Sequence, residues 1–379
     1  MKLAIISHTE HYIDENENVV GWGPTVREIN HLAAHFDKIY HVACLHKGSP
    51  PPSSLGYIGD NIEFVPIPPS GGETVLAKLS VLRTMPAVLR TVNGIINKVD
   101  YFQLRLPTGM GNYLLPWLMF KKPGARFWVK YAGNWAQKKA PLGYAFQRWF
   151  LTKNFLQCKV TINGRWPGQP DHILSFENPC LTEEERKKGA LVVKNKDYEG
   201  KLNFIFVGRV EEEEGVGLIL DAFKDLKNVK RIGKIRIVGG GPARLRYEKR
   251  AQDYGLDIVF LGFMSRPDLN ILFAESHVIL LPSFASEGFP KVIAEGANYG
   301  CIPIVSKVSS IPQYIVDSHN GFLMASIDSR GLEACLDRLL SQSAGDLSKI
   351  AHTAQSMAHA FTYDYYYKRI EEDILRVSS

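Results

Sequence analysis

Short apolar strands alternate with amphipathic helices along most of this chain, and the connections between them are short. The second half shows the pattern best, with apolar runs at residues 203–207, 234–238, 258–261, 278–281 and 302–306. The helices between them follow a period of 3.6, as in residues 216–226, where the apolar side chains share one face. Strands and helices that alternate in this way predict a parallel sheet covered on both faces.

The first half repeats the alternation. We expect strands at 3–7, 39–45, 101–106 and 126–131, and helices at 24–36, 76–99 and 143–156, the second broken or kinked at Pro86. The charged stretch 183–200 is interpreted as a surface excursion or linker. A chain of 379 residues can bury two cores. The prediction is an α/β protein with two Rossmann-like, doubly wound domains, residues 1–180 and 200–354.

Ligands of doubly wound sheets bind at the carboxyl ends of the strands. We therefore expect the functional site in a cleft between the two domains. The five cysteines are scattered and form no C-x-x-C pair, which argues against zinc and against a disulfide framework. The first residues are too soon polar for a signal peptide, and no apolar run approaches the ~20 residues of a membrane helix. These features predict a cytoplasmic protein.

Residues 101–170 contain no Asp or Glu but hold five of the six tryptophans and eleven cations: Arg105, Lys121, Lys122, Arg126, Lys130, Lys138, Lys139, Arg148, Lys153, Lys159 and Arg165. Lys and Arg favour an anionic lipid surface, and Trp favours its interface. The aromatic helix expected at 143–156 suits that role. We predict docking on the inner face of the cytoplasmic membrane, with a basic face of no function as the alternative. No nucleic-acid recognition motif accompanies the charge, so nucleic acid is not expected as a partner.

The segment 282–296 is the most informative about chemistry. A strand ends in a loop containing Glu287 and Gly288, Pro290 opens a helix, and Glu295 follows within it. Backbone N–H groups at such a helix start bind anions, and the carboxylates can accept hydrogen bonds from sugar hydroxyls. The alternative is that Glu287 stabilises the helix dipole and Glu295 lies on the surface.

The segment 282–296 resembles the E-x7-E motif of family 4 glycosyltransferases. Three further segments follow the family's order: residues 206–210 resemble its G-R-L element, 237–242 its V-G-x-G-P turn, and 259–264 its F-x-G strand end. Gly21-Trp22-Gly23-Pro24 stands where the family has a glycine-rich donor loop. The resemblance implies a GT-B fold with two facing domains, a retaining and metal-independent transfer, and a C-terminal helix, about 355–379, that packs back on the first domain.

The resemblance also implies roles for single residues. Glu295 would bind the ribose of a nucleotide sugar and Glu287 the transferred sugar. Arg209 would stabilise the departing diphosphate, so Glu287 and Arg209 are the expected catalytic residues. No cofactor or metal is expected, because no D-x-D motif stands in a suitable place. The expected donor-binding set is Gly21, Trp22, Gly23, Arg209, Gly240, Phe263, Met264, Glu287, Gly288, Phe289, Pro290, Lys291 and Glu295.

One position departs from the family. Glu214 stands where the family usually has a lysine, and a carboxylate there repels a diphosphate. Either Glu214 points to solvent or another cation substitutes, for which Lys291 is the candidate. On the acceptor side the candidates are His8 and Arg105, each near the end of an apolar strand. His277, just before a strand, is expected to be a core or edge histidine.

The resulting function is transfer of a sugar from a nucleotide sugar to a glycan or polyprenyl-diphosphate-linked acceptor, in bacterial surface polysaccharide synthesis. A dehydrogenase is disfavoured, because Arg244 replaces the third glycine of the dinucleotide fingerprint. Three alternatives on the same fold remain: a nucleotide-sugar epimerase, a phosphorylase, for which no pyridoxal-lysine motif is present, and a non-catalytic sugar-nucleotide-binding homologue.

Overall fold

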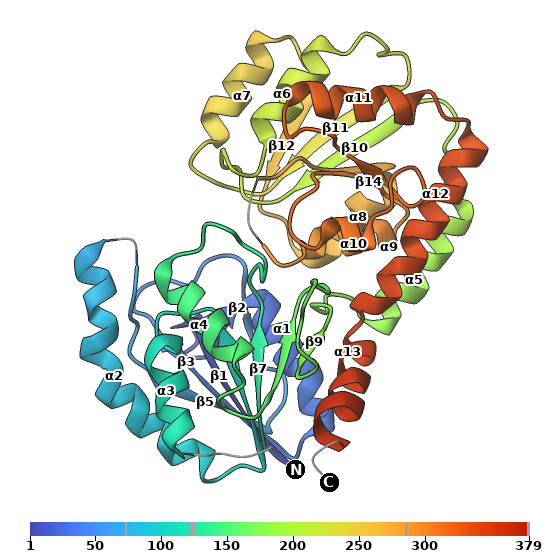
Figure 1. Ribbon diagram of the computed structural model, residues 1–379. Coiled ribbons are helices and arrows are strands. Elements are labelled where there is room, and N and C mark those ends of the chain that lie inside the picture. Colours follow the sequence, from blue (N-terminus) through green and yellow to red (C-terminus); the bar gives the residue numbers. More distant parts are fainter. Residues whose placement is uncertain (73, 122–125, 285–286, 377–379) are drawn as a thin grey trace. The chain divides into compact units, whose positions relative to one another are not determined.

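The computed structural model of the chain describes residues 1–72, 74–121, 126–284 and 287–376, with the side chains of 75–79 left out. The chain forms two compact units (Figure 1). Unit 1 comprises Met1–Glu177 and Tyr366–Ser379, and unit 2 comprises Asn178–Tyr365. Relative to the expected domains, residues 178–199 and 355–365 therefore lie within unit 2. Lys122, Ala285 and Ser286, which the sequence analysis used, lie outside the described residues.

Unit 1 is built on a sheet with a parallel core. Along this core the strands follow the order β5 (Ile62–Ile67), β3 (Lys38–Leu45), β1 (Lys2–Ile13), β6 (Tyr101–Leu106), β7 (Phe127–Tyr131), β8 (Lys159–Ile162) and β9 (Ile173–Ser175). The end of β1 forms an antiparallel hairpin with β2 (Val19–Trp22), which also pairs with β4 (Ser54–Gly56). The strand expected at 3–7 is thus too short, because its polar continuation is also paired.

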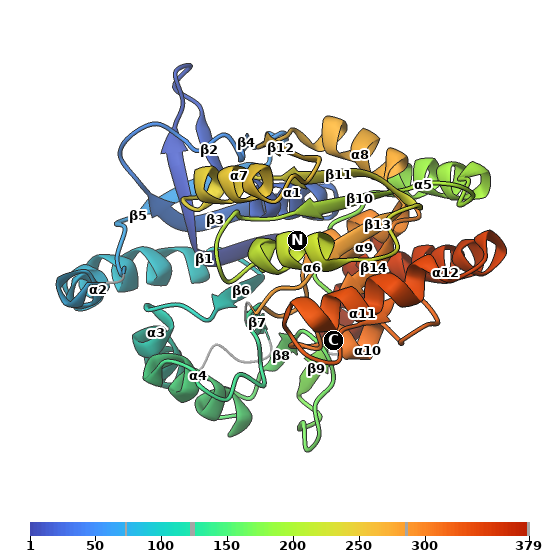
Figure 2. The same ribbon diagram turned by 90° about the horizontal axis from the view of Figure 1, so that it is seen from above.

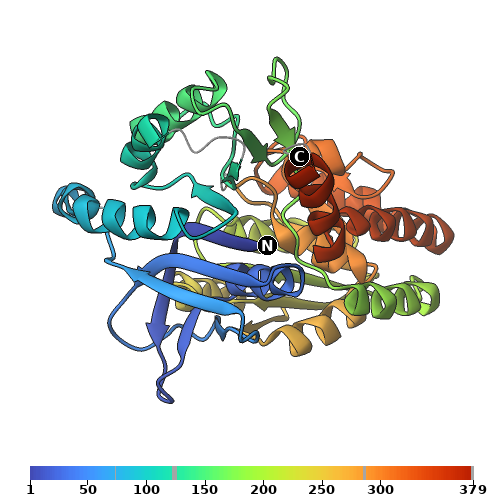
Figure 3. The same cartoon turned by 90° about the horizontal axis from the view of Figure 1, so that it is seen from below.

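Helices cover both faces of this sheet. On one face, α2 (Val75–Ile96), α3 (Gly111–Lys121) and α4 (Leu142–Thr152) pack on a core that includes Leu104 and Val129 (Figure 2). The other face is covered by α1 (Gly23–Leu32), followed by η1 (Ala33–His35), and by the C-terminal segment, dark red in Figure 3. The second expected helix is not broken, since α2 continues through Pro86.

Unit 2 contains a six-stranded parallel sheet. Its order is β12 (Ile258–Gly262), β11 (Ile232–Val238), β10 (Leu202–Val207), β13 (Val278–Leu281), β14 (Ile302–Val305) and β15 (Phe322–Leu323). One face carries α6 (Val216–Asp225), α7 (Arg244–Asp253) and α11 (Ser329–Leu340) (Figure 1). The other carries α8 (Arg266–Glu275) and α9 (Lys291–Asn298), with α5 (Glu183–Asn195) and α12 (Ala344–Met357) packed on α9. The shorter elements of unit 2 are α10 (Ile311–Tyr314) and η3 (Ala358–Phe361). The helix α13 (Tyr363–Ile370) begins in unit 2 and continues into unit 1, which also contains η4 (Glu371–Leu375). The five strands predicted for this half are confirmed.

The interpretation of 183–200 as an excursion or linker is wrong. Residues 183–195 form α5, which begins with a capping box: the Thr182 side chain accepts from the backbone N–H of Glu185, and the Glu185 carboxylate accepts from the N–H of Thr182. Such a reciprocal pair satisfies two otherwise free N–H groups at a helix start. The helix then packs on α9 and α12, which explains how so polar a sequence is held in place.

Candidate functional site

The strand order of unit 2 reverses at β10, and this reversal marks the candidate site. From β10 the chain proceeds through β11 to the edge strand β12, and then returns to β13 on the other side of β10. The loops that follow β10 and β13 therefore leave the same end of the sheet in opposite directions. Such a switch point is where ligands of open α/β sheets bind.

The two loops contact each other at the switch point. The N–H of Phe284 and the hydroxyl of Ser283 donate to the carbonyl of Glu213, at 2.8 and 3.2 Å. Gly215 has φ +79°, and a Cβ on it would lie 2.3 Å from the carbonyl oxygen of Pro282. Glycine is therefore required for this close approach.

The loops after β10, β11 and β12 are joined in the same way. The N–H of Val210 donates to Gly240 at 2.9 Å, and the N–H of Gly239 donates to Gly262 at 2.8 Å. The segments 206–210, 237–242 and 259–264, which the sequence indicated as motifs, therefore lie together at one edge of the sheet of unit 2. Phe263 continues from them with an exposed ring, whereas Met264 packs partly into the core.

Arg209 lies in the first of these loops, with 76% of its side chain exposed. Its guanidinium donates to Glu211 at 2.5 Å. An exposed ion pair of this kind is weak, about 0–1 kcal/mol. Arg209 can therefore exchange Glu211 for another anion at little cost.

Glu214 does not point freely to solvent, contrary to one of the two expected solutions. It is half-buried and hydrogen-bonded to Ser283. Burial, with the nearby charges of Glu287 and Glu211, raises the pKa of its carboxyl. Glu287 is more exposed, yet surrounding protein also raises the pKa of its carboxyl. Both groups therefore hold a proton more readily than ordinary carboxylates do.

The helix after Glu287 begins as predicted. Pro290 is the N-cap of α9, and Gly300, with φ +79°, follows its end. Gly288 accepts from the hydroxyl of Ser310 at 2.7 Å. Phe289, expected in the donor site, has a buried ring that stacks on Phe361 at 4.6 Å. Its ring belongs to the core, so only its backbone can serve a ligand.

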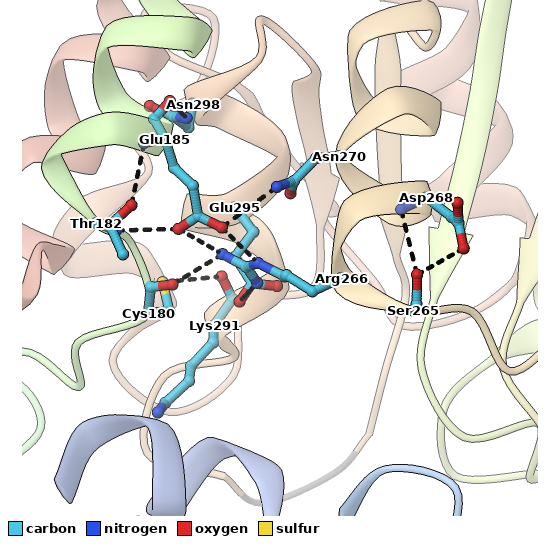
Figure 4. A network of polar contacts seen from close by, with 10 residues as sticks. All are labelled: Cys180, Thr182, Glu185, Ser265, Arg266, Asp268, Asn270, Lys291, Glu295 and Asn298. Carbon is cyan, nitrogen blue, oxygen red and sulfur yellow. Dashed lines mark hydrogen bonds and ion pairs between the residues drawn. The ribbon is translucent and has the colours of Figure 1, made fainter. Parts of the chain in front are cut away.

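Glu295 lies in α9 and is buried, which excludes the surface position considered as its alternative. Arg266, the first residue of α8, donates to the Glu295 carboxylate (Figure 4). The same guanidinium donates to Glu185 at 2.9 Å. Sequence reasoning missed Arg266 and Glu185, although the caps of both helices, at Ser265 and Thr182, are visible in the sequence. The Lys291 side chain points away from this group (Figure 4).

The glycines of the Gly21-Trp22-Gly23-Pro24 segment are explained by packing within unit 1. A Cβ on Gly21 would lie 2.2 Å from the ring of His11, its cross-strand partner. A Cβ on Gly23 would lie 2.5 Å from the carbonyl of Ser53, to which its N–H donates. Trp22 between them is exposed.

The two acceptor-side candidates are held by other residues of unit 1. His8 hydrogen-bonds the carbonyl of Ser70 at 2.6 Å. Arg105 lies within β6, not past it, and pairs with the buried Glu28 at 2.8 Å. The amino group of Lys130 binds both oxygens of Glu28 at 2.8 Å. Arg105 is therefore part of a buried ionic cluster, not a free cation.

A chain of buried polar groups at the end of β1 was also missed. Ser7 bonds to His41 at 2.8 Å, His41 to Tyr57 at 2.6 Å, and Tyr57 to His11 at 2.8 Å. Burial lowers the pKa of His11 to about 4, and burial with the charges of His11 and Arg105 lowers the pKa of His41 as well. Both imidazoles are neutral at physiological pH.

His277 is a structural histidine, as predicted. It accepts a hydrogen bond from the N–H of Asn203 at 2.9 Å. Burial, and to a smaller extent the positive charge of Lys196, lowers its pKa to about 4. The five cysteines are free and buried. Across the described ranges, no three His, Cys, Asp or Glu side chains are grouped so as to hold a metal ion.

Comparison with known sequences finds a family match for part of the chain. Residues 188–357 match the family described as glycosyl transferases group 1. The chain is 24% identical over 181 residues to the lipopolysaccharide 1,2-N-acetylglucosaminetransferase of Salmonella typhimurium, covering 45% of this chain and 47% of that protein. It is 28% identical over 181 residues to the putative colanic acid biosynthesis glycosyltransferase WcaL of Escherichia coli, covering 46% and 44%. The chain thus spans about half the length of these curated relatives.

Solved structures match over the whole chain. The sucrose-phosphate synthase of Thermosynechococcus elongatus has a TM-score of 0.71 at 15% identity, covering 100% of this chain and 99% of that one. HepE of Anabaena in complex with UDP has a TM-score of 0.68 at 15% identity, covering 99% and 100%. These likenesses confirm the predicted fold, two Rossmann-like domains of the GT-B type.

Proposed function

We propose that this chain is a retaining, metal-independent glycosyltransferase that uses a nucleotide sugar, because residues 188–357 match the family described as glycosyl transferases group 1. The observation that carries the proposal is the contact between the loops after β10 and β13 at the switch point of unit 2. It places Arg209, Glu214 and Glu287 on loops that meet at one sheet edge. UDP is a reasonable donor nucleotide to test first, since HepE of the same fold binds it.

In this proposal, Glu295 accepts from the ribose hydroxyls and Glu287 from the transferred sugar. The bond between the anomeric carbon and the diphosphate oxygen breaks, and a bond from that carbon to an acceptor oxygen forms on the same face. The acceptor's proton leaves with the diphosphate. Arg209 and the backbone N–H groups of Gly288 and Phe289 stabilise the departing charge, as fixed donors do in other transferases.

The acceptor we propose is a glycan or a polyprenyl-diphosphate-linked glycan of a bacterial surface polysaccharide. The support is the kind of product named for the relatives, lipopolysaccharide and colanic acid. Lys291 remains the proposed cation in place of the family lysine.

A thermal-shift screen of UDP-, GDP-, ADP- and CMP-sugars tests donor binding, since a ligand that binds the folded state raises its apparent stability. With the donor so found, Arg209→Ala should lower turnover about a hundredfold or more, the loss typical of a removed oxyanion donor. Arg376→Ala is the control, because the Arg376 side chain is also largely exposed, at 66%, and also forms an ion pair with a glutamate, Glu371. Equal turnover of the two variants would contradict the role of Arg209.

The same assay separates the alternatives. An epimerase converts the donor without any acceptor, and a non-catalytic homologue gives a thermal shift without turnover. Either result would replace the transferase proposal.

We also propose that unit 1 docks on an anionic membrane through the face formed by α3 and α4. Among the described residues, no helix is long and apolar enough to cross a membrane. Exposed apolar side chains instead gather here, with Phe120 at 78%, Leu142 at 90% and Trp149 at 51% exposure. Exposed cations accompany them: Lys121, Arg126, Lys138, Lys139 and Lys153.

The structure reduces the charge that can serve this docking. Lys130 and Arg105 share the buried Glu28 as their ion-pair partner, and Arg148 donates to three backbone carbonyls, of Asn134, Trp135 and Gln137. Flotation with anionic vesicles at low salt tests the surface, with Lys138→Glu/Lys139→Glu expected to abolish binding. The proposal would be contradicted if the wild type bound only to neutral vesicles, or if it bound to no vesicles at all.

A further inference from the structure

Glu295 belongs to a buried cluster in which one guanidinium lies between two carboxylates. Arg266 donates to Glu295 through Nη1 and to Glu185 through Nε, and its Nη2 donates to the carbonyl of Cys180 at 2.8 Å. These three residues come from α8, α9 and α5, which are distant in sequence (Figure 4). The cluster carries one surplus negative charge, since two carboxylates face one cation.

Arg266 is held rigidly. Besides the bonds above, its Nη2 reaches the second oxygen of Glu185 at 3.3 Å. Glu185 in turn accepts from the N–H of Thr182 at 2.9 Å and from the amide of Asn270 at 3.2 Å. Although burial opposes a charge on Arg266, Glu295 and Glu185 raise the pKa of its guanidinium further above its ordinary value. The pair Glu185–Arg266 is therefore a fixed, charged support for Glu295.

Glu295 is held through one oxygen only. Arg266 binds Oε1, and no hydrogen bond to Oε2 is formed by the residues that the structure describes. An acceptor oxygen next to a surplus negative charge favours a ligand group that donates a hydrogen bond and disfavours an anion. Vicinal hydroxyls meet this requirement, whereas a phosphate does not.

We infer that Glu185 and Arg266 are positioning residues that fix the Glu295 carboxylate for the ribose hydroxyls of the donor, so that they determine selection of ribonucleotides over deoxyribonucleotides. This inference rests on the proposed function, in which Glu295 binds ribose. Neither residue needs to touch the donor. Their effect is on the orientation of Glu295, because a carboxylate without Arg266 can rotate about its side-chain torsions.

The measurement is the ratio of the Kd of the 2′-deoxy or 3′-deoxy nucleoside diphosphate to the Kd of the ribonucleoside diphosphate, by titration calorimetry. A hydrogen bond to a charged group contributes about 1.5–3 kcal/mol, so the wild-type ratio for the hydroxyl concerned should be about tenfold or more. In Arg266→Gln the ratio should fall towards one, while Arg266→Lys, which keeps the charge, should restore part of it. A merely structural role would weaken both nucleotides alike and leave the ratio unchanged.

Arg236→Gln is the matched control, because Arg236 is also a buried arginine of unit 2 and pairs with Glu275 at 2.7 Å. Its ratio should equal that of the wild type. Glu185→Gln provides a second variant if Arg266→Gln does not fold, and it should also lower the ratio.

Two results overturn the inference in different ways. A ratio lost in Glu295→Gln but kept in Arg266→Gln and Glu185→Gln would refute the positioning role and leave the proposed function standing. A wild type that binds ribo- and deoxynucleotides equally, or binds neither, would refute the ribose role of Glu295 and the inference with it.

Discussion

Both units of the molecule bury a three-membered ionic cluster, and the two clusters have opposite composition. In unit 1 one carboxylate, Glu28, lies between two cations, Arg105 and Lys130. In unit 2 one cation, Arg266, lies between two carboxylates, Glu185 and Glu295. The first cluster has a surplus positive charge and the second a surplus negative charge.

The difference shows what each cluster is suited to do. Both oxygens of Glu28 are bound by Lys130, whose amino group also lies 4.5 Å from the ring centroid of Tyr366. This cluster joins α1, β6, β7 and the C-terminal segment of unit 1, and it has no oxygen to offer a ligand. Glu295, in contrast, is bound through one oxygen. A carboxylate whose two oxygens are both bound by the protein holds structural elements together. A carboxylate with one oxygen unbound can accept a hydrogen bond from a substrate.

The largest expected effect of a substitution is on the unfolding free energy of unit 1. Glu28→Gln leaves two buried cations without a counter-charge, which should cost about 3–5 kcal/mol of unfolding free energy. All six tryptophans lie in unit 1, so indole fluorescence during urea denaturation reports this unit. The control is Glu63→Gln, which removes the exposed partner of Lys38 and should cost less than about 1 kcal/mol. Similar costs for the two variants would contradict the importance of the buried cluster.

An intermediate effect concerns pH, because the polar chain beside the positive cluster contains His11 and His41. The pKa of His11 falls from 6.5 in the unfolded chain to about 4 in the folded one. Between these values the unfolded chain binds the proton more readily, so unit 1 loses stability as the pH falls from 6.5 to about 4. The loss from His11 is about 3 kcal/mol, and His41 acts in the same direction.

Urea denaturation from neutral pH to about pH 4.5, followed by indole fluorescence, measures this loss. His11→Gln should give a flatter dependence of stability on pH than the wild type, since a glutamine does not titrate. Parallel curves for the two proteins would show that His11 does not contribute.

The smallest expected effect on stability is in unit 2. Glu295→Gln removes the surplus charge and leaves Glu185 paired with Arg266, so the unfolding free energy should change by no more than about 1 kcal/mol. Ribonucleoside diphosphate affinity should nevertheless fall about tenfold, for the loss of a charged acceptor. Calorimetric unfolding and nucleotide titration measure the two quantities. A stability loss as large as that of Glu28→Gln would remove the contrast between the clusters.

The sequence predicted the elements of unit 2 well, because their apolar periodicity and their glycine and proline boundaries are local signals. The helix between Pro290 and Gly300 and the strands around it needed no tertiary information. The helix α5 was missed because its composition is charged, although Thr182 and Glu185 already have capping-box spacing. In unit 1 the predicted strand stopped at Ser7 because His8, Thr9, Glu10 and His11 are polar. The burial of His11 depends on His41 and Tyr57, which are remote in sequence.

The ionic partners could not be predicted for the same reason. The surplus of basic residues between 101 and 170 suggests surface charge, but Arg105 and Lys130 are largely buried and pair with Glu28, which lies 77 and 102 residues earlier in the sequence. Arg266 carries no local signal of its role, since Glu185 lies 81 residues before it and Glu295 29 residues after it. Local patterns located the loops of the site, while the contacts that orient its side chains are set by the fold.

The return of the chain to unit 1 at Tyr366 has a consequence for biosynthesis. Domains generally fold as units while the chain is made, starting from the N-terminus. Here Tyr366, Ile370 and Ile374 complete the core around Ile5 and Trp128. Unit 2 is continuous in sequence and can fold as soon as it leaves the ribosome, whereas the part of unit 1 before residue 178 must keep one face of its sheet open until Tyr366, Ile370 and Ile374 emerge.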